Sequence, residues 1–413
     1  MAVVGITSAQ TAPVELRLMW YNDGTEGEAL RAVLDDFEAA NPGIKVIVDT
    51  VAFADLATTL QAQVEAGTPP DMARLVDVAR FAGSYLDLRP LVADAEYWDT
   101  NFPPAVLGSM RSGEDDNGLY GYPTQFTVSG PYINRTLFEL AGVEVPSDVK
   151  EDVTWEEWEA AAVEVAEKTG TPYAVALDRS GHRFWTFSMS QGAEYLDADG
   201  VFTVDTPGFR SAAERLVRWH ESGIMPPEIW GGAAGTFTGA NEFFVNAQVV
   251  FYVSGSWQVA QFDTNIGDNF EWSAVPNPVD SAGKCMMPGG AITVAFADTA
   301  YPEEVALVMD YLASEPVLEK FSAESLFLPG QLALAEKGIE YPKQNENLNI
   351  FLAEIPSICD QAYDLQYSPY TFVLNPAIRD RLTQVITGEL TLDDAIVAVQ
   401  TAIDEAVAAA PAQ

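Results

Sequence analysis

Positive charge is scarce in this chain. Its 413 residues include 21 Lys and Arg against 61 Asp and Glu, so the formal net charge is −40. Such a surface repels phosphate backbones and anionic lipid headgroups, which argues against nucleic-acid binding and against membrane attachment through basic patches. The excess of acid also suggests a salty environment, because ions screen the self-repulsion over about 8 Å or less.

Histidine is also scarce, and the sequence lacks the usual catalytic motifs. His182 and His220 are the only histidines, and neither a GxSxG sequence nor a cluster of metal ligands accompanies them. Catalytic triads and zinc sites therefore have no candidate, and we expect neither a metal nor a cofactor. A carboxylate pair of the glycosidase type stays open among so many acidic residues.

Only two cysteines are present, Cys285 and Cys359, and they lie far apart in the sequence. Metal sites and redox motifs need closer or more numerous cysteines. A disulfide fits an exported protein, whereas two buried thiols fit a cytosolic one. We favour the disulfide.

Long apolar runs are also missing, since none approaches the roughly 20 residues that a membrane-spanning helix needs. We therefore expect a soluble protein. The first thirteen residues, MAVVGITSAQTAP, are small, apolar and uncharged, and we interpret them as a residual export signal without its basic start; a disordered native N-terminus is the alternative. The length exceeds what one core fills, so we expect two domains.

The sequence has one stretch around which the rest can be organised, residues 118–134, GLYGYPTQFTVSGPYIN. Aromatic and β-branched residues predict an extended segment, but Pro and Gly interrupt it in a way that does not suit one central strand. We predict a strand that leaves one sheet and enters another. A helix over 135–141 follows and ends at Gly142.

Units of α/β type flank this crossover on both sides. Strands predicted at 15–20, 44–48 and 71–75 alternate with helices, the first beginning with a capping-box pattern at Thr25 and Glu28. A second such pattern, Thr154 and Glu157, precedes a helix and a strand over 173–177. This order predicts doubly wound, mainly parallel sheets. Three breaks rich in Gly and Pro separate the blocks, which indicates two lobes joined by a hinge.

Seven short motifs in a fixed order carry a resemblance to a known family. The chain resembles the extracellular solute-binding proteins of ABC sugar importers, the maltose-binding-protein-like family, from about Val14 to the end. The motifs are Phe37 with Asn41-Pro42-Gly43-Ile44 and Val46, Gly67 with Pro69-Pro70-Asp71, Gly118-Leu119-Tyr120-Gly121-Tyr122-Pro123, Asn134 before a helix, Thr154-Trp155, Phe243-Phe244 before Ser254-Gly255-Ser256-Trp257, and Pro288-Gly289-Gly290.

This resemblance implies an α/β clamshell of the periplasmic-binding-protein type, with a mainly parallel, helix-flanked sheet in each lobe. The N-terminal lobe is expected over 14–125 and 291–328, and the C-terminal lobe over 130–287 and 331–413. Hinges are expected near 126–129, 288–290 and 329–330. The implied function is to capture a sugar or glycoside between the lobes and deliver it to membrane permease subunits. The implied protein is a periplasmic, non-enzymatic monomer that binds no nucleic acid.

The resemblance also places candidate ligand contacts in loops at strand ends, where open α/β sheets bind ligands. In the crossover the family often has acidic or aromatic residues, whereas this chain has amide and hydroxyl groups. The candidates are Tyr21, Asn22, Asp23, Arg74, Asp77, Gln125, Thr127, His182, Arg183, Trp185, Trp257, Gly289 and Gly290 through their backbone, Asn375 and Arg379.

Each candidate has a structural alternative, and so has the function. Arg74 and Asp77 could be a solvated pair, His182 and Arg183 could lie in a surface loop, and Arg379 could face solvent. The rival functions are a secreted carbohydrate-active hydrolase with a carboxylate pair, an importer component for an anionic sugar, and an adhesin or chaperone without a small ligand. We expect a neutral ligand, because long-range repulsion slows the capture of an anion.

Overall fold

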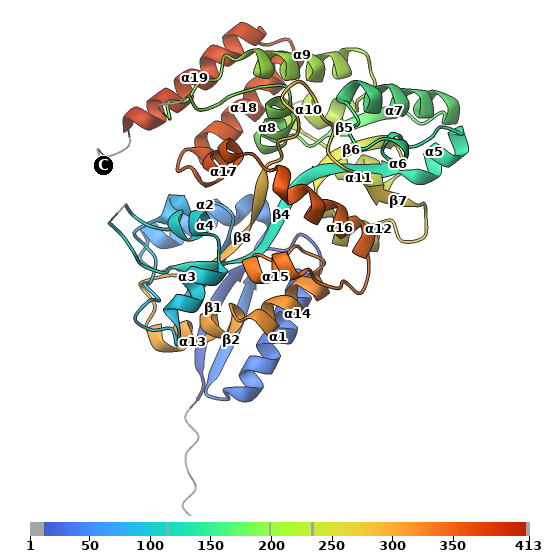
Figure 1. Ribbon diagram of the computed structural model, residues 1–413. Coiled ribbons are helices and arrows are strands. Elements are labelled where there is room, and N and C mark those ends of the chain that lie inside the picture. The colour runs from blue at the N-terminus through green and yellow to red at the C-terminus, as the bar shows by residue number, and fades with distance from the viewer. Residues whose placement is uncertain (1–11, 114, 198–199, 233–234, 410–413) are drawn as a thin grey trace, which may run out of the picture.

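The chain folds into two lobes, with β4 (Gly121–Asn134) and β8 (Pro288–Ala295) running from one into the other (Figure 1). The computed structural model describes residues 12–113, 115–197, 200–232 and 235–409. Each lobe has its own cluster of buried apolar side chains, so each has its own hydrophobic core. The two-lobed α/β fold expected from the sequence is confirmed. The expected export signal lies almost wholly outside the described residues.

The N-terminal lobe is built on three parallel strands. Strand β1 (Val14–Trp20) pairs with β2 (Ile44–Thr50) on one side and with β3 (Met72–Leu75) on the other. The apolar stripe of the first helix is fully buried, as its spacing predicts. The helices of this lobe are α1 (Glu26–Ala40), α2 (Phe53–Glu65), the 3₁₀ turn η1 (Ala79–Phe81), α3 (Ala95–Asn101), α4 (Pro104–Gly108), α13 (Pro302–Leu312), α14 (Glu315–Ser325) and α15 (Leu332–Lys337).

The C-terminal lobe is built on β5 (Tyr173–Leu177), β6 (Val249–Gly255) and β7 (Trp272–Ala274). Strand β6 pairs with β5 in parallel and with β4 in antiparallel orientation. The helices of this lobe are α5 (Arg135–Ala141), α6 (Pro146–Val149), α7 (Trp155–Thr169), α8 (Gly181–Ser190), α9 (Pro207–Glu221), α10 (Pro227–Trp230), α11 (Ala240–Val245), α12 (Gln258–Asn265), α16 (Asn345–Glu354), η3 (Ile355–Ser357), α17 (Asp360–Tyr367), α18 (Thr371–Ile386) and α19 (Leu392–Ala409).

Strand β4 is the predicted crossover. Its first half pairs with β8 as far as Val128, and from Ser129 onward it pairs with β6. The register against β8 shifts between Pro123 and Gln125, which accommodates the proline as an irregularity in the ladder. A Cβ on Gly130 would stand 2.7 Å from the Phe351 ring, so glycine permits that close packing. The predicted crossover is confirmed.

The sheets are mixed and not mainly parallel. Among the strands of the described residues, parallel pairing is limited to β1 with β2 and β3, and β5 with β6. Strands β4 and β8 pair antiparallel with each other because they run between the lobes in opposite directions. The alternation of strands and helices predicts parallel pairing within one lobe, but it does not predict the orientation of strands that run between the lobes.

The chain passes a third time between the lobes near Gly330. A Cβ on this glycine would lie 2.4 Å from the Pro123 carbonyl oxygen, so only glycine lets the chain pass β4 there. Leu326 and Leu328, which we expected in the N-terminal lobe, pack in the hydrophobic core of the C-terminal lobe. Leu334, which we expected in the C-terminal lobe, packs in the core of the N-terminal lobe. The other lobe boundaries stay predictions.

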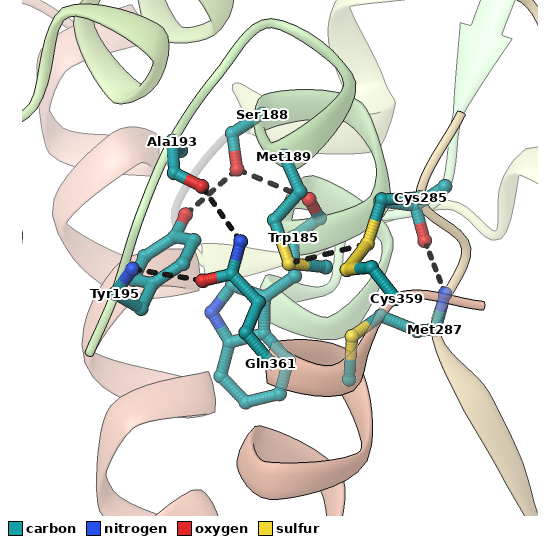
Figure 2. Close-up of a disulfide and its surroundings, with 10 residues drawn as sticks. Trp185, Ser188, Met189, Ala193, Tyr195, Cys285, Met287, Cys359 and Gln361 are labelled. Carbon is teal, nitrogen blue, oxygen red and sulfur yellow. Dashed lines mark hydrogen bonds between the residues drawn. A yellow bond between two sulfur atoms is a disulfide. The ribbon is translucent and has the colours of Figure 1, made fainter. Parts of the chain in front are cut away.

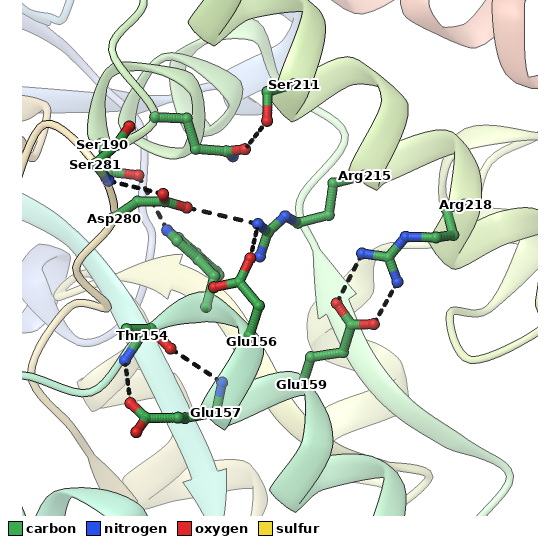
Figure 3. Close-up of polar contacts among 12 residues, drawn as sticks. Thr154, Glu156, Glu157, Glu159, Ser190, Ser211, Arg215, Arg218, Asp280 and Ser281 are labelled. Atoms are coloured by element: carbon green, nitrogen blue, oxygen red, sulfur yellow. Dashed lines mark hydrogen bonds and ion pairs between the residues drawn. The ribbon is translucent and has the colours of Figure 1, made fainter.

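The two predicted capping boxes have different outcomes. Thr154 and Glu157 form both reciprocal hydrogen bonds at the start of α7 (Figure 3). Thr25 makes no side-chain cap at the start of α1, so the prediction for Thr25 and Glu28 is wrong. At the start of α1 it is the carboxylate of Glu26 that accepts hydrogen bonds from the backbone, namely from the N–H groups of Asp23 and Gly24.

Figure 3 also shows how α9 is held beside α7. Arg218 on α9 reaches Glu159 on α7, with 3.1 Å between Nη2 and Oε2, and Arg215 pairs with Glu156. Arg215 also lies 3.5 Å from Asp280, in the segment that leads toward β8. The contact between Arg215 and Asp280 anchors this segment to the C-terminal lobe. No described helix is both long and apolar enough to cross a membrane.

Candidate functional site

A cavity of about 320 Å³ lies where the strand ends of the N-terminal lobe face α8, α17 and α18 of the C-terminal lobe. Both lobes and the crossing strands contribute to its wall. The lining residues are Tyr21, Asp23, Phe53, Val76, Asp77, Gln125, Thr127, Ser180, His182, Arg183, Trp257, Gly289, Gly290, Gln366, Thr371, Phe372, Asn375 and Pro376.

The N-terminal wall presents two carboxylates, one after β1 and one after β3. Because these parallel strands are neighbours, Asp23 and Asp77 emerge at the same edge of the sheet. Burial raises the pKa of Asp23 to about 6, although the Arg74 guanidinium acts in the opposite direction. Burial raises the pKa of Asp77 as well, opposed by Arg80. Both groups have lost water without full compensation by protein donors.

Arg74 supports this wall from behind and does not line the cavity, contrary to our expectation. Its side chain is fully buried, with Nη1 3.1 Å from Glu26 Oε1 and Nη2 3.5 Å from Asp23 Oδ2. The guanidinium also donates to the Tyr21 carbonyl oxygen and stacks 3.9 Å from the centre of the Tyr21 ring. Asn22 is likewise outside the lining, because its amide oxygen accepts from the Trp20 indole N–H at 3.0 Å.

The crossing strands form the floor of the cavity. A Cβ on Gly290 would stand 2.2 Å from the Gln125 carbonyl oxygen, and this glycine has a φ of +139°. A Cβ on Gly289 would stand 2.8 Å from Thr127 Oγ1. Two glycines in sequence therefore leave the floor free of side chains on β8. Gln125 is 2% exposed, and its Oε1 has no hydrogen-bond partner within the described part of the chain.

The first turn of α8 supplies His182. Its backbone N–H donates to Asn375 Oδ1 at 3.1 Å, and its Nε2 lies 3.0 Å from the Pro288 carbonyl oxygen and 2.8 Å from Gln366 Oε1. Two acceptors around Nε2 place the proton on that nitrogen. Nδ1 then accepts from the Arg183 guanidinium. Burial first, and the Arg183 charge second, lower the pKa of His182 to about 3, so the ring is neutral at pH 7.

Arg183 and Trp257 form the aromatic part of the wall. The guanidinium carbon lies 4.0 Å from the centre of the Trp257 ring. Its Nε is 3.7 Å from Asp178, which also accepts hydrogen bonds of 2.6 Å from the hydroxyls of Tyr252 and Ser254. Burial lowers the pKa of Arg183 to about 10, partly offset by the Asp178 charge, so Arg183 stays positive at pH 7.

Glycine also decides where the Trp257 ring lies. A Cβ on Gly255 would stand 1.9 Å from the Trp257 ring carbon Cζ3, so only glycine admits the ring at this position. With Arg183 on the ring, Trp257 is fixed as a rigid, partly exposed surface of the cavity. A flat apolar surface of this kind suits the C–H face of a sugar ring.

Two further expected contacts do not reach the cavity. Trp185 is fully buried and packs 6.2 Å from the Tyr195 ring centre, because only the first turn of α8 faces the cavity and Trp185 enters the core. Arg379 is one turn beyond Asn375 on α18 and pairs with its neighbour Asp380 at 2.8 Å. The other eleven candidates line the cavity together.

Seven lining residues were missed from the sequence: Phe53, Val76, Ser180, Gln366, Thr371, Phe372 and Pro376. Phe53 could have been found, because an aromatic just after the end of β2 obeys the strand-end rule that supports the other candidates. It is 54% exposed, with its ring centre 5.0 Å from that of Tyr21. Gln366 and Phe372 carry no local signal, since tertiary packing alone brings their helices to the cleft.

A disulfide holds one of those helices in place (Figure 2). Cys285 and Cys359 are bonded, with 5.3 Å between their Cα atoms, as we expected. Cys359 immediately precedes α17, and Gln361 in the first turn of this helix donates to the Ala193 carbonyl oxygen at 3.0 Å and accepts from the Tyr195 N–H at 3.1 Å. The start of α17 is therefore fixed to the C-terminal lobe, and its end carries Gln366 into the cavity.

Comparison with known proteins adds independent findings. The family model for bacterial extracellular solute-binding proteins matches residues 21–318. A Brucella abortus protein named as a binding protein is 25% identical over 363 residues, 85% of this chain and 83% of that protein. The multiple sugar-binding protein of Streptococcus mutans is 21% identical over 355 residues, 78% of this chain and 79% of that protein.

Solved structures share the fold. The GacH receptor of Streptomyces glaucescens, solved without ligand and with acarbose, is 20% identical. It superposes with a TM-score of 0.81, covering 97% of this chain and 100% of that one.

Proposed function

This chain belongs to the bacterial extracellular solute-binding protein family, and from that premise we propose that it is the substrate-binding component of an ABC importer for a sugar or glycoside. The observation that carries the proposal is the interlobe cavity, which combines a fixed tryptophan surface with carboxylate, amide and hydroxyl groups. A sugar needs an aromatic surface as well as polar groups, because its C–H faces pack on aromatic rings and its hydroxyls form hydrogen bonds.

The names of relatives support a carbohydrate ligand. The Streptococcus mutans relative is named for multiple sugars, and a relative from Halalkalibacterium halodurans, 23% identical over 287 residues, is named for arabinooligosaccharides. The Streptomyces glaucescens structure has a complex with acarbose. These ligands belong to those proteins, and for this chain they indicate the class of compound to test.

We assign the ligand contacts to the expected residues that line the cavity and add Phe53, Gln366 and Phe372. The protein acts after export, in the periplasm, as a monomer that closes on its ligand and docks on membrane permease subunits. It binds no nucleic acid and turns over no substrate. The negative net charge supports the exclusion of nucleic acid.

A thermal-shift screen over neutral, amino and acidic sugars tests the proposal. A ligand at 100 times its dissociation constant adds about 2.7 kcal/mol to the free energy of unfolding, which gives a clear rise in melting temperature. Each hit is then titrated by calorimetry and incubated with the protein for product analysis. One-to-one binding without product supports an importer component. Product formation would indicate the hydrolase, and no saturable binding by any sugar would contradict the proposal.

A further inference from the structure

Two carboxylates of the cavity wall, Asp23 and Asp77, follow the ends of neighbouring strands of the N-terminal sheet. Leu18 pairs with Met72 and Met19 with Ala73, and this constant offset also separates Asp23 from Asp77. β1 ends at Trp20 and β3 at Leu75, so both residues follow the paired part of the strands and line the same cavity. Neighbouring strands lie about 4.8 Å apart, so the two backbones emerge close together at this edge.

The end of β3 also lies beside β8, which forms part of the floor of the cavity. Strand β3 pairs antiparallel with β8, with Leu75 opposite Ile292, which brings Asp77 opposite Gly290 when the register is extended. Gly290 in turn pairs with Phe126, next to Gln125. Because Gly290 has no side chain, it adds none to the part of the cavity that Asp77 and Gln125 also line.

Negative charge exceeds positive charge at this edge. Within the described part of the chain, Arg74 is the one guanidinium paired with Asp23, and it lies nearer to Glu26, so two carboxylates share one cation. Arg80 is the cation nearest to Asp77 in the chain, but its Nε donates to Gln61 at 3.3 Å and its guanidinium lies over the rings of Phe81 and Phe372. The ion pairs among the described residues include none to Asp77, although the Arg80 charge and the Arg80 backbone N–H both oppose the rise in its pKa.

The amide oxygen of Gln125 is a further hydrogen-bond acceptor without a donor among the described residues. Gln125 is 2% exposed and lines the cavity, and its Oε1 has no partner among the described residues. A buried acceptor without a donor is unfavourable, and a ligand donor relieves it. The raised pKa values of Asp23 and Asp77 report the same deficiency at the carboxylates.

The opposite wall does not supply the missing positive charge. Arg183 is engaged by Asp178, by the Trp257 ring and by His182, and His182 itself is neutral. Arg183 Nε lies 3.7 Å from Asp178 and has no hydrogen-bond partner among the described residues. An anionic ligand would therefore meet two carboxylates on one side and, on the other, an arginine whose charge already faces Asp178. A cationic ligand group would find its charge partners at the ends of β1 and β3.

We propose that the edge formed by Asp23 and Asp77 is a subsite for an ammonium group, so that the substrate is an amino-substituted sugar or glycoside. This inference rests on the proposed function and specifies its ligand class. The ammonium donates charge-assisted hydrogen bonds to this pair of carboxylates or to one of them, and Gln125 Oε1 accepts from the ammonium or from a neighbouring hydroxyl. The negative field of the whole surface also concentrates cations near the cleft.

Calorimetry with matched sugar pairs tests the subsite. Glucose with glucosamine, galactose with galactosamine, and cellobiose with chitobiose differ only in carrying hydroxyl or amino groups at C2. At pH 7 we expect the amino member of at least one pair to bind about tenfold tighter or more than its neutral partner, because charge-assisted hydrogen bonds are roughly twice as strong as neutral ones.

Variants connect that preference to the named carboxylates. Asp77→Asn keeps the shape and removes the charge, and we expect it to weaken the amino sugar about tenfold while the neutral partner changes less than threefold. Asp23→Asn should act in the same direction, and melting curves check that both variants fold. Asp298→Asn is the matched control, because this exposed residue follows the end of β8 that pairs with the start of β3, at the far edge of the sheet.

The outcomes separate this inference from the proposed function. Tighter binding of an amino sugar that Asp77→Asn abolishes supports the subsite. Neutral members that bind as tightly as, or tighter than, their amino partners overturn the subsite and leave the importer function standing. An amino preference that survives both Asn substitutions also overturns it. If no sugar of any charge binds, both proposals fail.

Discussion

Trp257 lies in the cleft because Gly255 leaves space for its ring and Arg183 stacks on it. We predict that Trp257→Ala weakens ligand binding about tenfold, since an aromatic contact contributes roughly 1 kcal/mol or more. Calorimetry with the best ligand measures the loss. The matched control is Trp185→Phe, which changes an indole in the same lobe outside the cavity and should reduce stability but not affinity. Unchanged affinity in Trp257→Ala would remove the stacking assignment.

Asp23 predicts a pH dependence of stability with a definite sign. Its pKa is raised by burial to about 6, so the folded state binds its proton more tightly than the unfolded state does. The stability this proton contributes is fully present below pH 4 and is lost as the pH rises through 6. Relative to wild type, Asp23→Asn should therefore gain roughly 2 kcal/mol in unfolding free energy between pH 4 and pH 7.

Urea unfolding of both proteins across this range measures the effect. His182, whose pKa is lowered to about 3, contributes a slope of the opposite sign, but it is present in both proteins and cancels in the difference. Asp298→Asn provides the control for loss of an exposed charge. A difference between wild type and Asp23→Asn that does not vary with pH would contradict the raised pKa.

Among the elements, α17 links the disulfide to the ligand site. Cys359 precedes its first turn, and Gln366 near its end reaches His182 and the cavity. We predict that reduction, or Cys359→Ser with Cys285→Ser, lowers the unfolding free energy by roughly 4 kcal/mol in the chain-entropy model for a loop of this length. Affinity should fall too, because α17 then holds Gln366 less firmly.

Melting curves and calorimetry with and without reductant test both effects. The double serine variant should be indifferent to reductant, which separates the disulfide from other actions of the reagent. A reduced protein of unchanged melting temperature would contradict the stabilising role. A lower melting temperature with unchanged affinity would restrict the disulfide to stability.

For the whole molecule, the three passages of chain between two separate cores allow one lobe to rotate against the other. We predict that ligand binding compacts the protein, because a ligand that contacts both walls binds the closed form selectively. Small-angle scattering at saturating ligand should show a smaller radius of gyration than without ligand. Trp257→Ala at the same ligand concentration should show less compaction, and identical curves for wild type with and without ligand would contradict closure.

Local sequence determined much of the fold. The apolar stripe of α1, the capping box of α7 and the limits of α5 and β5 follow from interactions within a few residues, which the sequence displays directly. Thr25 shows the limit of such reasoning, because Glu26 on the same turn satisfies the backbone N–H groups instead, in contact with a distant arginine.

The residues of the site also fall into those that the sequence predicts and those that long-range packing places. Tyr21, Asp23, Asp77 and Trp257 were found through the family resemblance, which the strand-end rule supports because strand ends can be recognised locally. Side chains that depend on long-range packing could not be found so. The sequence does not show that Arg74 turns beneath Tyr21, nor that α17 and α18 return to the cleft with Gln366 and Phe372. These placements depend on contacts between residues far apart in the chain, and only tertiary structure decides which of them form.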